Sequence, residues 1–190
     1  MEADQFELDA STLFVIWIDR FDQITGLKSN SLFAETDQLG LKEKNTFVGT
    51  NLFDYVLGHF TRQFLRKFLN AARETREQKR MLYRCDSPSH KQLMEMRACS
   101  TPDGELRISH SLVESEAFEF EVILHSATQS QNSRVLRCSI CNRLRHRGTT
   151  DWREAECIAE PDTVTRVIHT VCPECRSGLK VKSILSRTPR

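Results

Sequence analysis

The sequence predicts an α+β protein in which a five-stranded antiparallel sheet carries helices on one face and is followed by a small C-terminal domain stabilised by zinc. Three observations lead to this prediction: the order of strand-like and helix-like segments, one long amphipathic helix, and two widely separated Cys-x-x-Cys pairs. Helices packed on one face of an antiparallel sheet form a two-layer arrangement around a single core. The 190 residues are 39% hydrophobic and 28% charged, which allows one sizeable core and a small satellite domain.

Two strand-like segments open the predicted sheet. The apolar, β-rich run LFVIWI, residues 13–18, predicts a buried strand. A turn at Asp19 and Arg20 leads to a second strand in QITGLKS, residues 23–29. A short helix is expected in FVGTNLFDYVLG after Gly49, with Thr50 or Asn51 as its N-cap.

The clearest periodicity in the chain predicts an amphipathic helix over residues 60–79, with Thr61 as its N-cap and Arg and Lys on its outer face. Its apolar positions are Phe60, Phe64, Leu65, Phe68, Leu69 and Ala72. Core packing explains such a stripe better than cofactor binding does.

Three further segments complete the predicted sheet as antiparallel strands. They are RMLYRCDS (80–87), KQLMEMRACS (91–100) and ELRISHSLVES (105–115). The last two are joined by TPDG, residues 101–104, a reverse turn with proline at its second position and glycine at its fourth. We therefore expect two strands, short helices, one long helix and then three strands.

The order of these elements and their residue patterns, over residues 10–115, resemble those of a PAS domain. The similarity lies in the opening hairpin, in the Gly-x-x-hydrophobic-hydrophobic-Asp helix at GTNLFD, in the long helix and in the three closing strands. The resemblance implies a sensory or dimerisation module, often with a pocket between the sheet and the helices.

The residues named as candidates for such a pocket are His59, Phe64, Phe68 and His110. A PAS pocket holds haem, flavin, a small metabolite or nothing, and the pocket ligand of this chain is left open. Haem would need an axial ligand such as His59 or His110, although a lone histidine is more often a surface or hydrogen-bonded residue. The Asn-Cys-Arg-like motif of photoactive flavin relatives is absent, which argues against light sensing through a flavin–cysteine bond. Cys85 and Cys99 are interpreted as ordinary strand residues, with a redox role as the alternative.

The second group of candidate site residues consists of two cysteine pairs, Cys138 with Cys141 and Cys172 with Cys175. The chain has seven cysteines, an odd number, and four of them in two such pairs favour a metal over disulfides in a reducing compartment. Two Cys-x-x-Cys turns can complete a tetrahedral four-sulfur shell, which suits structural zinc and leaves no open position for catalysis. The alternatives are a thioredoxin-like redox pair, or a ligand set that includes His169 or Cys157.

The C-terminal segment also resembles a cysteine ribbon that follows PAS domains in bacterial signalling proteins. The matching residues are Cys138, Cys141, Arg143, Leu144, Arg145, Gly148, Trp152, His169, Cys172, Pro173 and Cys175. The chain departs from the family where RVIHTVCPEC replaces the usual Phe-Ser-His-Gly before the second pair, which puts the local turn in doubt and leaves the ligands intact. In relatives this segment accompanies a histidine kinase or a cyclase. Since we find neither here, the resemblance implies output through a partner protein.

Charge and composition divide the chain into a PAS-like domain (1–125), a linker (126–133) and a zinc-ribbon-like domain (134–190). Residues 1–125 carry 15 basic and 20 acidic side chains, a net charge of −5, whereas residues 126–190 carry 12 basic and 6 acidic side chains, a net charge of +6. The segment SATQSQNS at 126–133 has no large apolar residue. The period of EAFEFEVILH, residues 116–125, leaves a helix and an edge strand equally open.

These features together predict a non-enzymatic bacterial regulatory protein, cytoplasmic, forming homodimers and contacting a protein partner. No phosphate loop or catalytic triad is recognisable, and the longest apolar run is too short to span a membrane. The first alternative is a nucleic-acid-binding regulator that contacts phosphates through basic side chains of the C-terminal domain, and the second is a haem- or flavin-binding sensor. The basic side chains are Arg134, Arg137, Arg143, Arg145, Arg147, Arg153 and Arg166.

Overall fold

The computed structural model describes residues 11–30, 47–127 and 133–177. In chain order its elements are β1 (Thr12–Ile18), β2 (Ile24–Ser29), the 3₁₀ helix η2 (Leu52–Asp54), α2 (His59–Thr75), β3 (Lys79–Arg84), β4 (His90–Ser100), β5 (Leu106–Ala117), β6 (Ile123–Ser126), β7 (Val135–Cys138), β8 (Leu144–His146), the 3₁₀ helix η3 (Ala155–Cys157), β9 (Val164–Thr170) and α3 (Pro173–Arg176).

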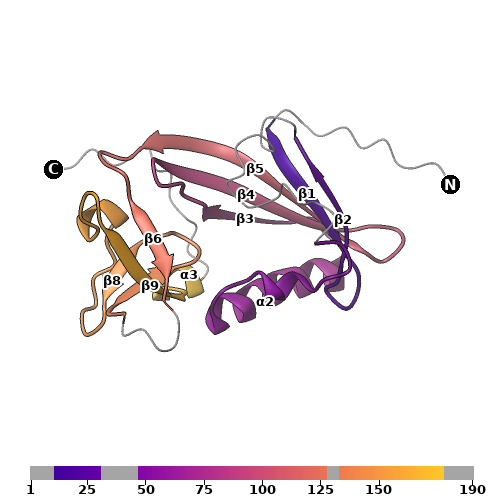
Figure 1. The fold of residues 1–190 in the computed structure, drawn as a ribbon. Coiled ribbons are helices and arrows are strands. Elements are labelled where there is room, and N and C mark those ends of the chain that lie inside the picture. The colour runs from indigo at the N-terminus through magenta and orange to yellow at the C-terminus, as the bar shows by residue number, and fades with distance from the viewer. Residues whose placement is uncertain (1–10, 31–46, 128–132, 178–190) are drawn as a thin grey trace.

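The first five strands form one antiparallel sheet in the order β2-β1-β5-β4-β3. The first and last of these strands in sequence, β1 and β5, therefore lie side by side at the centre of the sheet. Helix α2 lies across one face of the sheet (Figure 1). The predicted fold class is confirmed: an α+β layer built on a five-stranded antiparallel sheet, with a C-terminal group of four cysteines beside it.

Strand β4 shows how alternation sorts side chains between the two faces of the sheet. Met96 and Ala98 belong to the core on the helix side, whereas Glu95, between Met94 and Met96, binds Arg80 and Arg97 on the opposite face. The predicted turn at residues 101–104 is present, because the Gly104 N–H donates to the Thr101 carbonyl and Gly104 has a positive φ of 85°. The turn sets the register between β4 and β5.

Helix α2 is amphipathic as predicted, but both of its predicted ends are wrong. Its N-cap is Gly58, which has no side chain to cap with, and the Thr61 hydroxyl instead donates to Ser139 in the C-terminal part of the chain. The helix ends at Thr75 because Arg76 adopts a left-handed conformation with φ of 53°. At η2 the predicted cap is confirmed, since the Asn51 side chain accepts the N–H of Phe53.

The main core lies between α2 and the sheet. Its buried members are Ile18, Ile24, Phe53, Leu69, Ala72, Met96, Ala98, Leu106 and Ile108. Phe68 and Leu65 pack against this core, whereas Phe60 at the start of the predicted stripe is 47% exposed. Apolar residues that recur every four positions move gradually around a helix of 3.6 residues per turn. The first and last of them therefore face different parts of the molecule.

The second sheet has the order β6-β9-β7-β8, in which β9 pairs in parallel with both β6 and β7. Residues 116–125, for which the sequence favoured neither a helix nor a strand, therefore continue β5 to Ala117 and then enter the edge strand β6. Phe118 and Val122 pack into the core of this second sheet. Since the predicted boundary at residues 125 and 126 falls within β6, we propose that the C-terminal unit begins near Phe118.

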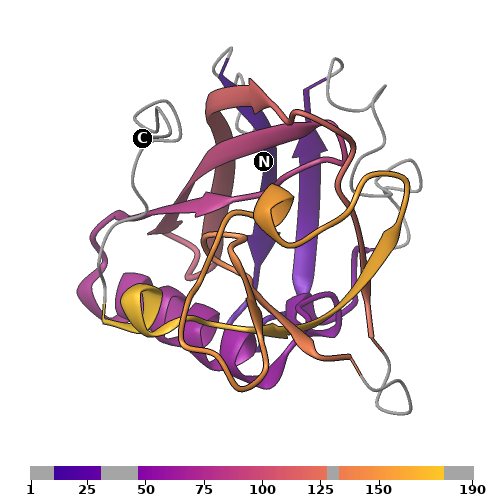
Figure 2. The same ribbon diagram turned by 90° about the vertical axis from the view of Figure 1, so that its left-hand side faces the viewer.

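The C-terminal part of the chain lies against α2 and the end of β3 (Figures 1 and 2). One point of closest approach is Gly58, where a Cβ atom would lie 2.9 Å from the carbonyl oxygen of His169 on β9. Gly58 also has a φ of 85°, a backbone conformation that residues other than glycine rarely adopt. Glycine is thus required here for two separable reasons.

Replacing Gly58 by Ala should lower the free energy of unfolding more than the same change at Gly104. Both glycines have a φ of 85°, but nothing lies within 4 Å of a Cβ at Gly104. The control therefore reports the backbone strain alone, and the extra loss at Gly58, about 1–3 kcal/mol, reports the contact with β9. Urea unfolding measures both, and equal losses would show that α2 and β9 are not held in contact.

Candidate metal centre and ligand cavity

The structure brings the four predicted metal ligands together. Cys138 ends β7 and Cys141 lies in the turn that follows, while Cys172 caps α3 and Cys175 lies within it. All four side chains are buried, and their Sγ atoms lie within 4.8 Å of one another. Residues 34 positions apart in sequence thus form one four-sulfur cluster, which could bind a metal such as zinc.

Each cysteine turn is shaped by local hydrogen bonds. Asn142 takes a left-handed conformation with φ of 55°, and its N–H donates to the Cys138 carbonyl. In α3 the Cys175 N–H donates to the sulfur of Cys172 at 3.5 Å, and the Cys172 N–H donates to the sulfur of Cys138 at 3.3 Å. Such N–H donors favour the thiolate form, which is the form that binds metal.

The sulfur geometry fits a tetrahedral zinc ion. Zinc–sulfur bonds of about 2.3 Å place the sulfurs of a tetrahedron about 3.8 Å apart, and the Cys141 and Cys172 sulfurs are 3.9 Å apart. Hydrogen bonds within the cluster lower the pKa of Cys141 and Cys172 and raise the pKa of Cys138 and Cys175, so the four thiols titrate as one coupled group. Four thiolates would complete the shell and leave no place for water, so the site suits a structural metal.

Two predicted substitute ligands lie outside the cluster. Cys157 is exposed in η3. The His169 ring bonds Ser126 at 2.9 Å through Nε2 and approaches Ser139 through Nδ1 at 3.4 Å. Both ring nitrogens of His169 therefore face hydroxyl groups, and its position stabilises the first cysteine turn from the side.

The cysteine cluster is packed between α2 and β3. Phe64 from α2, Tyr83 from β3 and Trp152 pack against the four cysteines and Ile140. The N–H of Arg84, the last residue of β3, donates to the Ile140 carbonyl at 2.7 Å. The first cysteine turn thus contacts both layers of the N-terminal part of the chain, since Thr61 of α2 also donates to Ser139.

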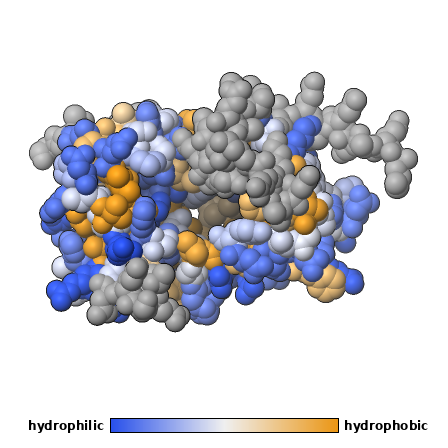
Figure 3. All heavy atoms as spheres, in the orientation of Figure 1, coloured by the Kyte–Doolittle hydropathy of each residue, from blue (hydrophilic) through white to orange (hydrophobic). Residues whose placement is uncertain are grey.

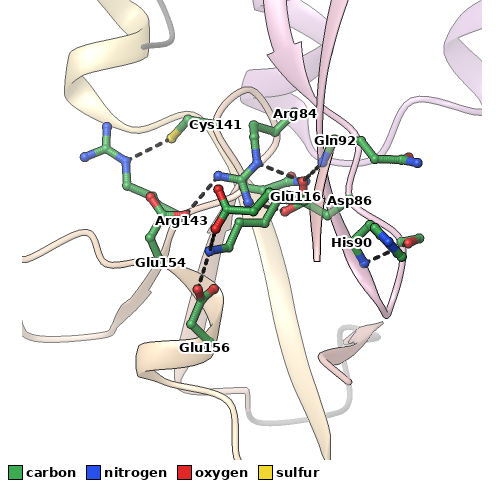
Figure 4. A network of polar contacts seen from close by, with 12 residues as sticks. Arg84, Asp86, His90, Gln92, Glu116, Cys141, Arg143, Glu154 and Glu156 are labelled. Carbon is green, nitrogen blue, oxygen red and sulfur yellow. Dashed lines mark hydrogen bonds and ion pairs between the residues drawn. The ribbon is translucent and has the colours of Figure 1, made fainter. Parts of the chain in front are cut away.

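Buried ion pairs add a second link between the two parts (Figure 4). The Arg84 side chain, 4% exposed, binds Asp86 at 2.6 Å and Glu154 at 2.9 Å. Asp86 also accepts the N–H of Gln92, and Lys91 on β4 pairs with Glu156 in η3. Charges removed from water must be paired, so these contacts fix how η3 sits on the β3–β4 hairpin.

A cavity of about 410 Å³ lies between the sheet and α2. Space-filling Figure 3 shows the surface hollowed between these two layers. Its lining residues are Phe14, Ile16, Ile24, Leu27, Phe47, Leu52, Tyr55, Val56, Leu65, Met96, Ile108 and His110. The volume lies within the range of small-molecule sites, about 300–1,000 Å³.

Of the four residues predicted for the pocket, His110 lines the cavity and the other three lie elsewhere. His59 is exposed at the start of α2, with its ring 2.9 Å from the Gln63 amide. Phe64 faces the cysteine cluster and Phe68 packs on the main core. The helix places Leu65, one residue after Phe64, toward the cavity, because adjacent residues point about 100° apart.

His110 is the principal polar group of the cavity. Its ring stacks on Phe14 at a centroid distance of 4.2 Å, and its Nδ1 lies 2.7 Å from the Tyr83 hydroxyl. Burial lowers the pKa of His110 to about 3 and raises the pKa of Tyr83 well above its usual value. Both groups are therefore neutral at pH 7, and Tyr83 connects the cavity with the cysteine cluster.

Sequence reasoning missed most of the cavity wall and the whole ion-pair network. Phe14 and Ile16 could not be assigned to the face toward α2, because residues 13–18 are apolar on both faces of the strand. Nothing in the sequence singled out Tyr83 and Arg84 either, because a tyrosine or an arginine in a strand commonly keeps its polar end in water.

No model of a known protein family matches the sequence, and no curated protein matches it significantly. Solved structures similar to this chain include the PAS domain of the quorum-sensing receptor RpfR from Cronobacter turicensis in complex with BDSF, with 17% identity and a TM-score of 0.42 over 57% of this chain and 100% of that chain. A sensory box sensor histidine kinase from Vibrio cholerae has 14% identity and a TM-score of 0.38 over 55% of this chain and 82% of that chain.

Among the described residues, no helix is both long enough and apolar enough to cross a membrane.

Removing a metal bound at the cysteine cluster should loosen the N-terminal part of the chain as well as the C-terminal part. With a strong chelator and reductant present, amide hydrogen exchange should accelerate in α2 and β3 together with residues 133–177, because the first cysteine turn bonds both elements. The β1–β2 hairpin serves as the internal reference. Cys172→Ser should reproduce the effect and Cys157→Ser, outside the cluster, should not. Acceleration confined to residues 133–177 would show that the cluster supports only its own sheet.

Acid should destabilise the protein partly through His110. Its pKa is about 3 in the folded chain and about 6.5 when unfolded, so the unfolded chain binds more protons between these values. The stability that His110 contributes is complete above about pH 6.5 and is lost as the pH falls toward 3. His110→Phe should therefore flatten the slope of unfolding free energy against pH, measured with urea between pH 7 and 5. Burial also lowers the pKa of His169, to about 4, so the part of the pH dependence that comes from His169 should remain in the variant. An unchanged slope would show that His110 is solvated.

Proposed function

We propose that this chain is a non-enzymatic sensory and regulatory protein in which the PAS-like layer holds a small molecule and the four cysteines hold a structural zinc ion. The output passes to a protein partner, and the chain acts as a homodimer. The observation that carries the proposal is that the cavity and the cysteine cluster share two walls. Leu65 on α2 lines the cavity while Phe64 beside it packs on the cluster, and Tyr83 bonds His110 while also packing on the cluster.

A structural role for zinc is supported by the burial of its ligands and by the completeness of the set. The second core, made of residues such as Val135, Leu144 and Val167, is small. Small domains commonly rely on a metal or on disulfides for stability. The cysteines are free thiols, so a cation is the remaining cross-link that joins β7 to α3.

The haem and flavin alternatives are less well supported. Of the two histidines considered as axial ligands, His59 is exposed outside the cavity, and His110 has Nδ1 engaged with Tyr83 and its ring stacked on Phe14. A flavin ring is held by polar groups along its edge, whereas Tyr55 and His110 are the polar members of this lining. A small apolar metabolite matches the cavity better.

Nucleic-acid binding is also less well supported than a protein partner. Arg137 is largely buried beside Asp86 and Cys85, and Arg143 binds Glu174 and the Cys141 sulfur. Both arginines are thus committed to internal contacts, which leaves fewer basic groups for phosphates. A protein partner is supported by exposed apolar side chains along the segment that enters α2, namely Val48, Tyr55, Leu57 and Phe60, each 47–49% exposed.

Native mass spectrometry of the untagged full chain, combined with metal analysis, tests the proposal. We expect one zinc ion per chain, a dimer, and a retained small molecule released on denaturation. Purification under reducing conditions excludes metal loss by thiol oxidation. A folded protein with no bound cation would contradict the zinc assignment, and a monomer that neither retains nor rebinds any small molecule would contradict the sensory role.

A further inference from the structure

We infer that the cavity takes an uncharged, largely apolar molecule whose single oxygen acceptor, a ketone or ester carbonyl, bonds Nε2–H of His110. The inference rests on the proposed sensory function and specifies the ligand class of that site. It depends on three features of the structure: the composition of the lining, the hydrogen bond between His110 and Tyr83, and the burial of His110.

The lining is apolar almost throughout. Of the twelve lining residues in the part of the chain that the structure describes, ten are Phe, Ile, Leu, Val or Met, and the remaining two are Tyr55 and His110. Tyr55 is 48% exposed and its hydroxyl bonds Thr50, so it belongs to the rim. His110 is 6% exposed and is therefore the polar group available at the inner end.

The hydrogen bond to Tyr83 determines what His110 can offer a ligand. The Tyr83 hydroxyl lies 2.7 Å from Nδ1 of His110. Because a phenol is a strong donor and a neutral imidazole nitrogen a good acceptor, we assign Tyr83 as the donor of this bond. The ring proton then lies on Nε2. With Nδ1 occupied by Tyr83 and the ring held against Phe14, Nε2–H is the donor left for a molecule in the cavity.

Charge in the ligand is disfavoured by the same surroundings. A carboxylate placed among the described lining residues would find no arginine or lysine there, and burying an unpaired carboxylate carries a large desolvation cost. His110 resists becoming the missing cation, because burial strongly favours its neutral form. A carbonyl oxygen needs only one donor, which His110 supplies.

Competition against the neutral dye Nile red tests this inference on the zinc-loaded full chain at pH 7.5. We expect 2-decanone to displace the dye and decanoate, of equal chain length, to be at least about ten-fold weaker. His110→Phe should weaken 2-decanone about five-fold, the effect of one hydrogen bond, and leave decanoate unchanged. Tyr83→Phe, which keeps the imidazole, should weaken the ketone less.

Two filling variants locate the binding. Leu65→Phe and Ile16→Phe narrow the cavity and should abolish the binding of Nile red and of 2-decanone. Leu82→Phe, on the opposite face of the sheet beside Glu95, should leave both unchanged. Circular dichroism checks that each variant is folded. Two results would overturn the ligand class and leave the sensory proposal standing. One is binding of decanoate as tight as, or tighter than, that of 2-decanone, and the other is an equal loss of binding in Leu65→Phe and Leu82→Phe. Failure of the folded wild type to bind Nile red or either decane derivative would overturn both.

Discussion

The arrangement of the whole molecule depends on the contact of one cysteine turn, residues 138–141, with two elements of the first sheet. Ile140 accepts the N–H of Arg84 at the end of β3, and Ser139 accepts the hydroxyl of Thr61 in α2. Helix α2 alone is too narrow to cover a five-stranded sheet. The cysteine cluster, with Phe64 and Tyr83 packed on it, therefore acts as the second part of the layer that covers this sheet.

Buried charge gives this interface its orientation. Apolar packing around the cysteines is non-directional and would tolerate small rotations of the C-terminal unit. The Arg84 side chain, which binds Asp86 on its own hairpin and Glu154 beside η3, allows few such rotations because each would leave a buried charge unpaired. Such a pair contributes less to stability than to the choice of one arrangement among several.

The sequence allowed the sheet, the amphipathic helix and the four-sulfur cluster to be predicted, because alternation, helical period and cysteine spacing are local patterns. The residues that connect the two units could not be predicted. Thr61 looked like a helix cap, and only the approach of Ser139, 78 positions later, gives its hydroxyl another partner. His110 was found as a polar residue in a strand, but its role depends on Tyr83 and Phe14, which the sheet places beside it.

Under the proposed function, the shared walls would make ligand binding in the cavity and metal binding at the cluster thermodynamically dependent on each other. Tyr83 touches both, through its hydroxyl on His110 and its ring on the cysteines. A ligand that bonds Nε2–H of His110 polarises the ring and strengthens its bond to Tyr83, which holds the tyrosine against the cluster. Linkage then requires that metal binding strengthen ligand binding by the same factor. A structural zinc ion, as proposed for the cluster, would therefore change the affinity of the cavity for its ligand without taking part in any reaction.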